Sequence, residues 1–122
     1  MAKTDNTIAP ALTQEGKKAF WTASVYSNDA DTTSTVEIHA AASSGVLCVD
    51  HILVVCDQDP STISIMDGTN VLFGPYEITA TEYGGFVDIN LKRAVKLSGA
   101  LGVKCGANAP VNVLAEGFIA GG

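Results

Sequence analysis

Residues 46–56 are the longest apolar run of the chain and read Val46-Leu47-Cys48-Val49-Asp50-His51-Ile52-Leu53-Val54-Val55-Cys56. Only Asp50 and His51 interrupt this run. Its Val and Ile side chains suit a pleated sheet better than a helix, and its length is typical of a central strand buried on both faces. Alternate side chains of a regular strand share a face. One face of the strand is predicted to carry Leu47, Val49, Leu53 and Val55. The opposite face is predicted to carry Ile52 and Val54.

Shorter strand patterns lie on both sides of this run, with turn residues between them. Asp57-Gln58-Asp59-Pro60 ends the run because proline has no donor for a strand ladder, and Asp67-Gly68 is a hairpin dipeptide. The expected strands are 20–26, 36–40, 46–56, 62–66, 71–73, 86–91, 95–97, 101–105 and 111–119. Val, Ile and Thr supply 31 of the 122 residues, and no helical pattern stands out. The sequence therefore predicts an all-β fold, a single jelly-roll-like β-sandwich of about eight strands.

Residues 1–18 differ from the rest, and we expect an extended N-terminal arm ahead of a sandwich domain at 19–122. The arm has no strand alternation, but three of its apolar residues are spaced two apart and would share one face of an extended chain. Such a face fits a groove or a partner's sheet. The arm ends with two lysines, and the next seventy or so residues carry no basic side chain. The first predicted strand, which follows the arm, contains a group of aromatic side chains. The candidate partner-binding residues are Ile8, Pro10, Leu12, Lys17, Lys18 and Trp21.

Composition narrows the classes of partner and the site of synthesis. A net charge of −6 argues against nucleic-acid binding, and no apolar run approaches the ~20 residues that span a bilayer. Three cysteines cannot all pair within one chain, and Met1–Thr7 lacks the apolar segment of a secretory signal. We therefore expect buried, reduced thiols and synthesis in a cytoplasm.

Catalytic and metal-binding motifs are not found in the sequence, which contains no G-x-S-x-G, H-E-x-x-H or P-loop pattern. Asp50 and His51 are neighbours and would point to opposite faces of a regular strand, which argues against a dyad. For the same reason His51 would point away from the thiols of Cys48 and Cys56, so the C-x2-H-x4-C pattern is a poor zinc site. We expect a non-enzymatic protein without cofactor or metal.

The order of strand and turn motifs along the chain resembles that of the small β-sandwich structural proteins of tailed bacteriophage virions. The stretches that carry this resemblance, between about Gly45 and Gly121, are Val46–Cys56, Asp59–Gly68, Val71–Pro75, Gly84–Leu91, Leu97–Val103 and Val111–Gly117. The resemblance implies a capsid decoration (cement) protein that binds the major capsid protein and itself, as a homotrimer or homodimer. It also implies a place on the capsid exterior after synthesis in the host bacterial cytoplasm. A tail, fibre or baseplate component is the alternative within the same group.

Two other classes remain open on the residues alone. A glycan-binding sandwich would show Trp21 and Tyr26 together on an exposed, concave face. A cupin-like jelly-roll enzyme would need clustered metal ligands, for which the chain offers only two histidines, His39 and His51.

Overall fold

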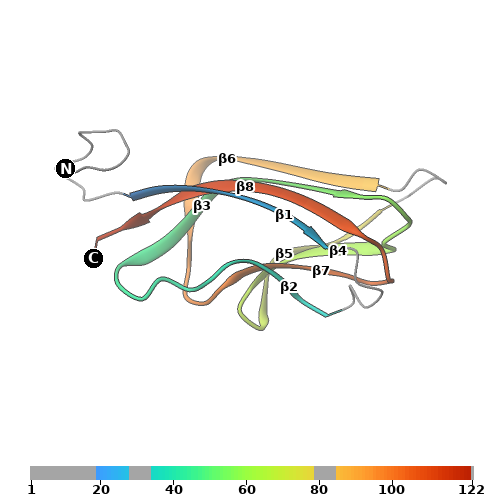
Figure 1. Ribbon diagram of the computed structural model, residues 1–122, viewed down its shortest axis with the longest axis horizontal. Coiled ribbons are helices and arrows are strands. Elements are labelled where there is room, and N and C mark those ends of the chain that lie inside the picture. The colour runs from blue at the N-terminus through green and yellow to red at the C-terminus, as the bar shows by residue number, and fades with distance from the viewer. Residues whose placement is uncertain (1–18, 28–33, 79–84, 122) are drawn as a thin grey trace.

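The computed structural model describes residues 19–27, 34–78 and 85–121, which form eight β-strands in two layers (Figure 1). The strands are β1 (Ala19–Ser27), β2 (Val36–His39), β3 (Val46–Cys56), β4 (Thr62–Asp67), β5 (Asn70–Glu77), β6 (Gly85–Leu97), β7 (Leu101–Cys105) and β8 (Val111–Ala120). The segment 1–18, with the predicted residues Ile8, Pro10, Leu12, Lys17 and Lys18, lies outside the described residues.

The topology is that of a jelly roll. One four-stranded sheet has the order β1-β8-β3-β6 and the other the order β2-β7-β4-β5, with every pair antiparallel. The first strand lies beside the eighth, the second beside the seventh, the third beside the sixth and the fourth beside the fifth. Four nested pairs of this kind describe one long hairpin rolled into a sandwich. The prediction of a single, jelly-roll-like β-sandwich is confirmed.

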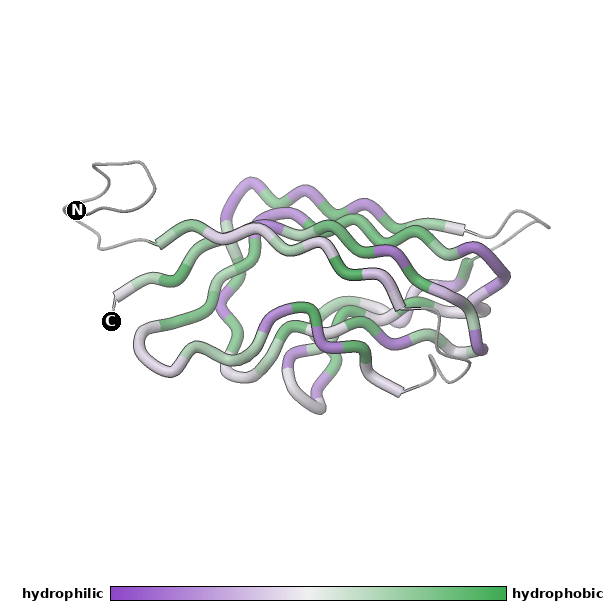
Figure 2. The backbone as a smooth tube through the Cα atoms, viewed as in Figure 1, coloured by the Kyte–Doolittle hydropathy of each residue, from purple (hydrophilic) through white to green (hydrophobic). Residues whose placement is uncertain are grey.

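The core lies between the inner faces of the two sheets. Hydrophobic and hydrophilic residues alternate along several strands (Figure 2), as expected where one face of a strand is buried. Gly68 begins the β4–β5 turn with a φ of 63°, as the Asp67-Gly68 dipeptide predicts. The largest fully buried side chains are Leu47, Ile52, Ile63, Ile65, Leu101, Val49, Val54, Val103, Val111, Val113 and Pro60.

The central position of β3 between β6 and β8 is confirmed, but the prediction of its two faces is wrong beyond Val49. A β-bulge places Asp50 and His51 opposite the single residue Glu116 of β8. The extra residue reverses the alternation, so Ile52 joins Val49 on the inner face while Leu53 moves to the outer face. β3 is thus buried along its inner face. On its outer face Cys48 is buried, Leu53 is half-buried and Val55 is exposed.

Two strands that the sequence predicts separately are one strand in the structure, with the irregularity at the bulge between them. The segments 86–91 and 95–97 belong to a single strand, β6, which pairs with β3 at Asn90 and again at Val95. Between these two positions β6 carries residues 91–94, while β3 carries only Asp50. The prediction of two separate strands here is wrong, because the ladder between β3 and β6 continues on both sides of this irregularity.

Candidate interaction surface

Exposed apolar side chains gather on one face of the molecule. Among the described residues, eight large hydrophobic side chains are exposed, and six of them lie on the outer face of the β1-β8-β3-β6 sheet, the upper layer in Figure 1. The six are Phe20, Tyr26, Val46, Val55, Phe86 and Leu114. The remaining two, Val71 and Tyr76, lie on β5 of the other sheet.

Four of these exposed side chains lie together with half-buried Leu53 at one end of the outer face, with Asn112 between Tyr26 and Val55. We call this group the outer-face patch: Tyr26, Leu53, Val55, Phe86 and Leu114. Leu53 pairs directly with Leu114, and Val55 pairs directly with Phe86. Phe86 is 66% exposed and Tyr26 58%. Because aromatic side chains each carry about 150–250 Å² of surface, the patch exposes about 400 Å². The largest apolar patch on a typical monomer is of that size and is often functional.

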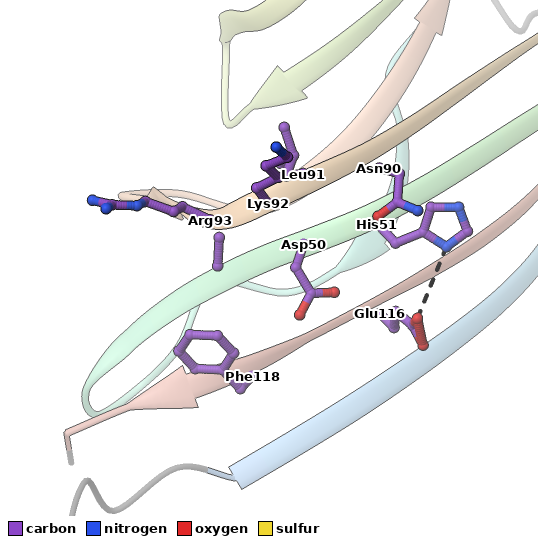
Figure 3. Close-up of a pocket in the computed structure, with 9 residues that line it drawn as sticks. Asp50, His51, Asn90, Leu91, Lys92, Arg93, Glu116 and Phe118 are labelled. Atoms are coloured by element: carbon purple, nitrogen blue, oxygen red, sulfur yellow. Dashed lines mark ion pairs between the residues drawn. The ribbon is translucent and has the colours of Figure 1, made fainter.

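A polar band crosses the outer face beside this patch. His51 Nε2 lies 2.7 Å from Asp88 Oδ1. On the other side of the ring, His51 Nδ1 lies 3.9 Å from Glu116 Oε2, the pair marked in Figure 3. Both carboxylates are about half exposed, so solvent screens the two pairs and each stabilises the fold by under about 1 kcal/mol. The two contacts hold the imidazole between the carboxylates, and its side chain remains 26% exposed.

The bulge itself opens a depression of about 560 Å³ in the outer face (Figure 3). It is lined by Asp50, His51, Asn90, Leu91, Lys92, Arg93, Ala94, Glu116 and Phe118. Asp50 and His51 thus line the same depression, which corrects the prediction that neighbouring residues there point to opposite faces. None of the nine lining residues is a Ser, Thr or Cys.

The structure separates the two aromatic residues that a glycan site would bring together. Trp21 and Tyr26 lie five residues apart on regular β1, so they point to opposite faces. Trp21 packs against the core, its ring 4.6 Å from the ring of His39, while Tyr26 lies on the outer face. The indole Nε1 of Trp21 is buried and has no hydrogen-bond partner among the described residues.

The three cysteines are buried thiols, as predicted. Cys56 of β3 and Cys105 of β7 share a side-chain hydrogen bond between the two sheets. This bond and burial hold the pKa of the Cys56 thiol above its ordinary value, so the thiol stays protonated and unreactive. Across residues 19–27, 34–78 and 85–121 no group of three or more His, Cys, Asp or Glu side chains is placed to hold a metal ion.

The cluster of His51 with Asp88 and Glu116 was not predicted from the sequence, because its members come from three different strands, β3, β6 and β8.

Comparison of the chain with protein-family models, curated proteins and solved structures gives no match. The described part of the chain has no helix long and apolar enough to cross a membrane.

Proposed function

We propose that this chain is a non-enzymatic structural protein of a virion, a capsid decoration protein that binds the major capsid protein and itself to stabilise the head. The observation that carries the proposal is the concentration of exposed apolar side chains on one sheet face. A soluble chain keeps such a patch at a cost in solubility unless a protein covers it. The jelly roll supports the same reading, because it recurs in viral capsid domains.

The size of the outer-face patch indicates what kind of contact it makes. Burying about 400 Å² of apolar surface at about 25 cal/mol per Å² contributes about 10 kcal/mol. Association itself costs about 4–15 kcal/mol, and a standard interface buries about 800 Å² on each partner. The patch alone therefore supports a weak contact. Many copies that also contact each other would bind the shell firmly through such weak contacts. Each bound copy raises the effective concentration of its neighbours at their own binding sites.

The net charge of −6 supports an outer position on the particle. Encapsidated nucleic acid attracts proteins through Lys and Arg on its phosphates. On the described part of the outer face the basic side chains Lys92, Arg93 and Lys96 all belong to β6. An acidic protein has no such attraction to the packaged nucleic acid, which fits a position on the capsid exterior.

Binding to particles that lack the protein tests the proposal. Serine at both Phe86 and Leu114 removes two exposed apolar side chains of the outer-face patch, and the dissociation constant for the particle should rise at least tenfold. Val71→Ser is the control, because Val71 (50% exposed) is about as exposed as Leu114 (49%) but lies on β5 of the opposite sheet. Unchanged binding by the double variant would exclude the patch as the contact surface. A copy number on the order of hundreds per particle indicates the capsid, and about a dozen or fewer a tail component.

A glycan-binding sandwich is the second candidate, favoured by the depression at the bulge. Phe118 offers an aromatic surface there, beside the amide of Asn90 and the carboxylates of Asp50 and Glu116. Sugar sites combine these groups, and lectins also use the jelly roll. Binding of surface glycans that Glu116→Ala abolishes would favour this function over capsid binding.

A further inference from the structure

A sandwich of two open sheets has four edge strands, here β1 and β6 in one sheet and β2 and β5 in the other. An edge strand presents a row of unpaired backbone donors and acceptors that can pair with another chain. Proteins protect such edges with charges, prolines, bulges or very short strands. An edge without any of these features marks a place where another strand is accepted.

Three of the four edges are protected. β2 has only four residues, and its register shifts between Glu37 and His39. β5 contains Pro75, which has no donor, and its pairing with β4 shifts twice. β6 is interrupted at residues 91–94 and carries three basic side chains, Lys92, Arg93 and Lys96.

β1 has none of these features. Its nine residues, Ala-Phe-Trp-Thr-Ala-Ser-Val-Tyr-Ser, include no charge, no proline and no glycine. Its register with β8 is unbroken from Ala19 opposite Ile119 to Ser27 opposite Val111. Its other edge has no strand partner in the described part of the chain (Figure 1).

We propose that the open edge of β1 is a self-association surface, where β1 pairs antiparallel with β1 of a second copy across a two-fold axis at Ala23. The two β1-β8-β3-β6 sheets then become one continuous eight-stranded sheet. This inference deepens the proposed function and rests on its self-association part, to which it gives a surface and a stoichiometry of two.

The register follows from the strand itself. When a strand pairs antiparallel with its own copy, one residue lies opposite the same residue of the second copy. The two-fold axis passes midway between these two residues. Ala23 is the midpoint of Ala19–Ser27, and an axis there gives full overlap of nine residues. The same register pairs Thr22 with Ser24 of the partner subunit and Phe20 with Tyr26 of the partner subunit.

The aromatic pairing would bring together two aromatic side chains that are largely exposed in the monomer. Phe20 is 70% exposed and Tyr26 is 58% exposed, and both lie on the outer face. The Phe20 ring already meets the Phe118 ring edge to face at 6.1 Å. Pairing adds Tyr26 of the partner subunit to this row, and aromatic cross-strand pairs stabilise sheets.

Charge favours a second copy of β1 as the occupant. None of the nine side chains is ionisable at neutral pH, so the edge meets itself without repulsion. The same pairing through the β6 edge would bring its cluster of Lys92, Arg93 and Lys96 toward a second such cluster. Like charges placed opposite each other destabilise strand pairs.

Two charge variants test both the surface and the register. Thr22 and Ser24 are exposed, so lysines at these positions leave the core unchanged. In the proposed register Thr22→Lys with Ser24→Lys places introduced lysines opposite each other twice, whereas Thr22→Lys with Ser24→Glu places opposite charges there. Sedimentation of the purified full chain should give a dimer that weakens at least tenfold in the first variant and persists in the second.

Amide hydrogen exchange supplies the second measurement. An open edge leaves alternate amides of residues 19–26 unprotected, and pairing protects them as protein concentration rises. A monomer at every concentration, a trimer, or a dimer that both variants leave unchanged would overturn the proposal. So would protection that is independent of concentration and lost in a chain starting at Ala19, because residues 1–18 would then cover the edge. Since no particle is present, failure here leaves the proposed capsid binding standing, and failed particle binding leaves the dimer standing.

Discussion

Val49 and Ile52 point into the core from the same face of β3, although three positions separate them in the sequence. The bulge at Asp50 and His51 causes this spacing, because it inserts one residue into β3 opposite β8. It also determines the outer face, because it turns Leu53 and Val55 outward and so places them in the outer-face patch.

Alanine substitutions at Ile52 and Leu53 distinguish this arrangement from a regular strand. Ile52 is 1% exposed in the core, so Ile52→Ala should cost about 2–5 kcal/mol of unfolding free energy by cavity formation. Leu53 is half-buried on the outer face, so Leu53→Ala should cost about 1 kcal/mol. Urea denaturation of the two variants gives both values. A larger loss for Leu53→Ala than for Ile52→Ala would mean that the strand has no bulge.

The strands could be predicted from the sequence because their signals are local. Alternation and turn residues such as Asp67-Gly68 and Pro60 act within a few positions, and they indicated β3 as the central strand. The bulge has a weaker signal, a polar pair inside an apolar run, which a regular alternation misreads. The outer-face patch and the contact of His51 with Asp88 depend on which strands become neighbours, and long-range pairing leaves no pattern in a single sequence.

Gly117 occupies a position where no side chain fits. A Cβ there would overlap the carbonyl oxygen of Cys48 and would lie 2.9 Å from Cζ2 of Trp21. Because the carbonyl belongs to the paired backbone of β3, it cannot move aside without breaking the ladder. Gly117→Ala should therefore destabilise the fold by about 3 kcal/mol or more. Asn112→Ala, at an exposed position of the same strand, serves as the control and should change stability by under about 0.5 kcal/mol. Equal stabilities in thermal and urea unfolding would contradict the close packing of β8 on β3.

The Asp67 carboxylate joins the β4–β5 turn to the β6–β7 turn. One oxygen accepts a hydrogen bond from the backbone N–H of Gly99 at 2.6 Å, and the other accepts one from Ser98 N–H at 3.1 Å. Asp67→Ala leaves both amides without this partner and should cost about 1.5–3 kcal/mol. Asp59→Ala removes one local bond, to Ser61 N–H at 2.8 Å, and should cost about 1 kcal/mol or less. Equal losses for the two variants would show that Asp67 does not join the turns.

The Cys56 thiol should make stability fall in alkaline solution. Its pKa in the folded chain is raised above the ordinary value of 9.0, first by the hydrogen bond to Cys105 and then by burial. The unfolded chain therefore loses this proton first, and the free energy of unfolding declines as pH rises above about 9, by at most about 1.4 kcal/mol per pH unit. The decline should be smaller in Cys56→Ala, measured between pH 7 and 10.5. Identical slopes in both proteins would show that the thiol does not titrate differently on folding.

The segment 1–18 remains a predicted anchor, and its removal tests it. Ile8, Pro10 and Leu12 are spaced to share one face of an extended chain, and Lys17 and Lys18 can pair with an acidic neighbour, each for under about 1 kcal/mol. A chain starting at Ala19 retains all eight strands, so its melting temperature should stay close to that of the full chain. Its affinity for particles lacking the protein should fall at least tenfold, because burial of three apolar side chains is lost. Alanine at Ile8 and Leu12 in the full chain should reproduce most of that loss, whereas alanine at Lys17 and Lys18 should weaken binding less and mainly at low salt. If the shortened chain binds particles as tightly as the full chain, the anchor lies within the sandwich, and the outer-face patch then accounts for the contact.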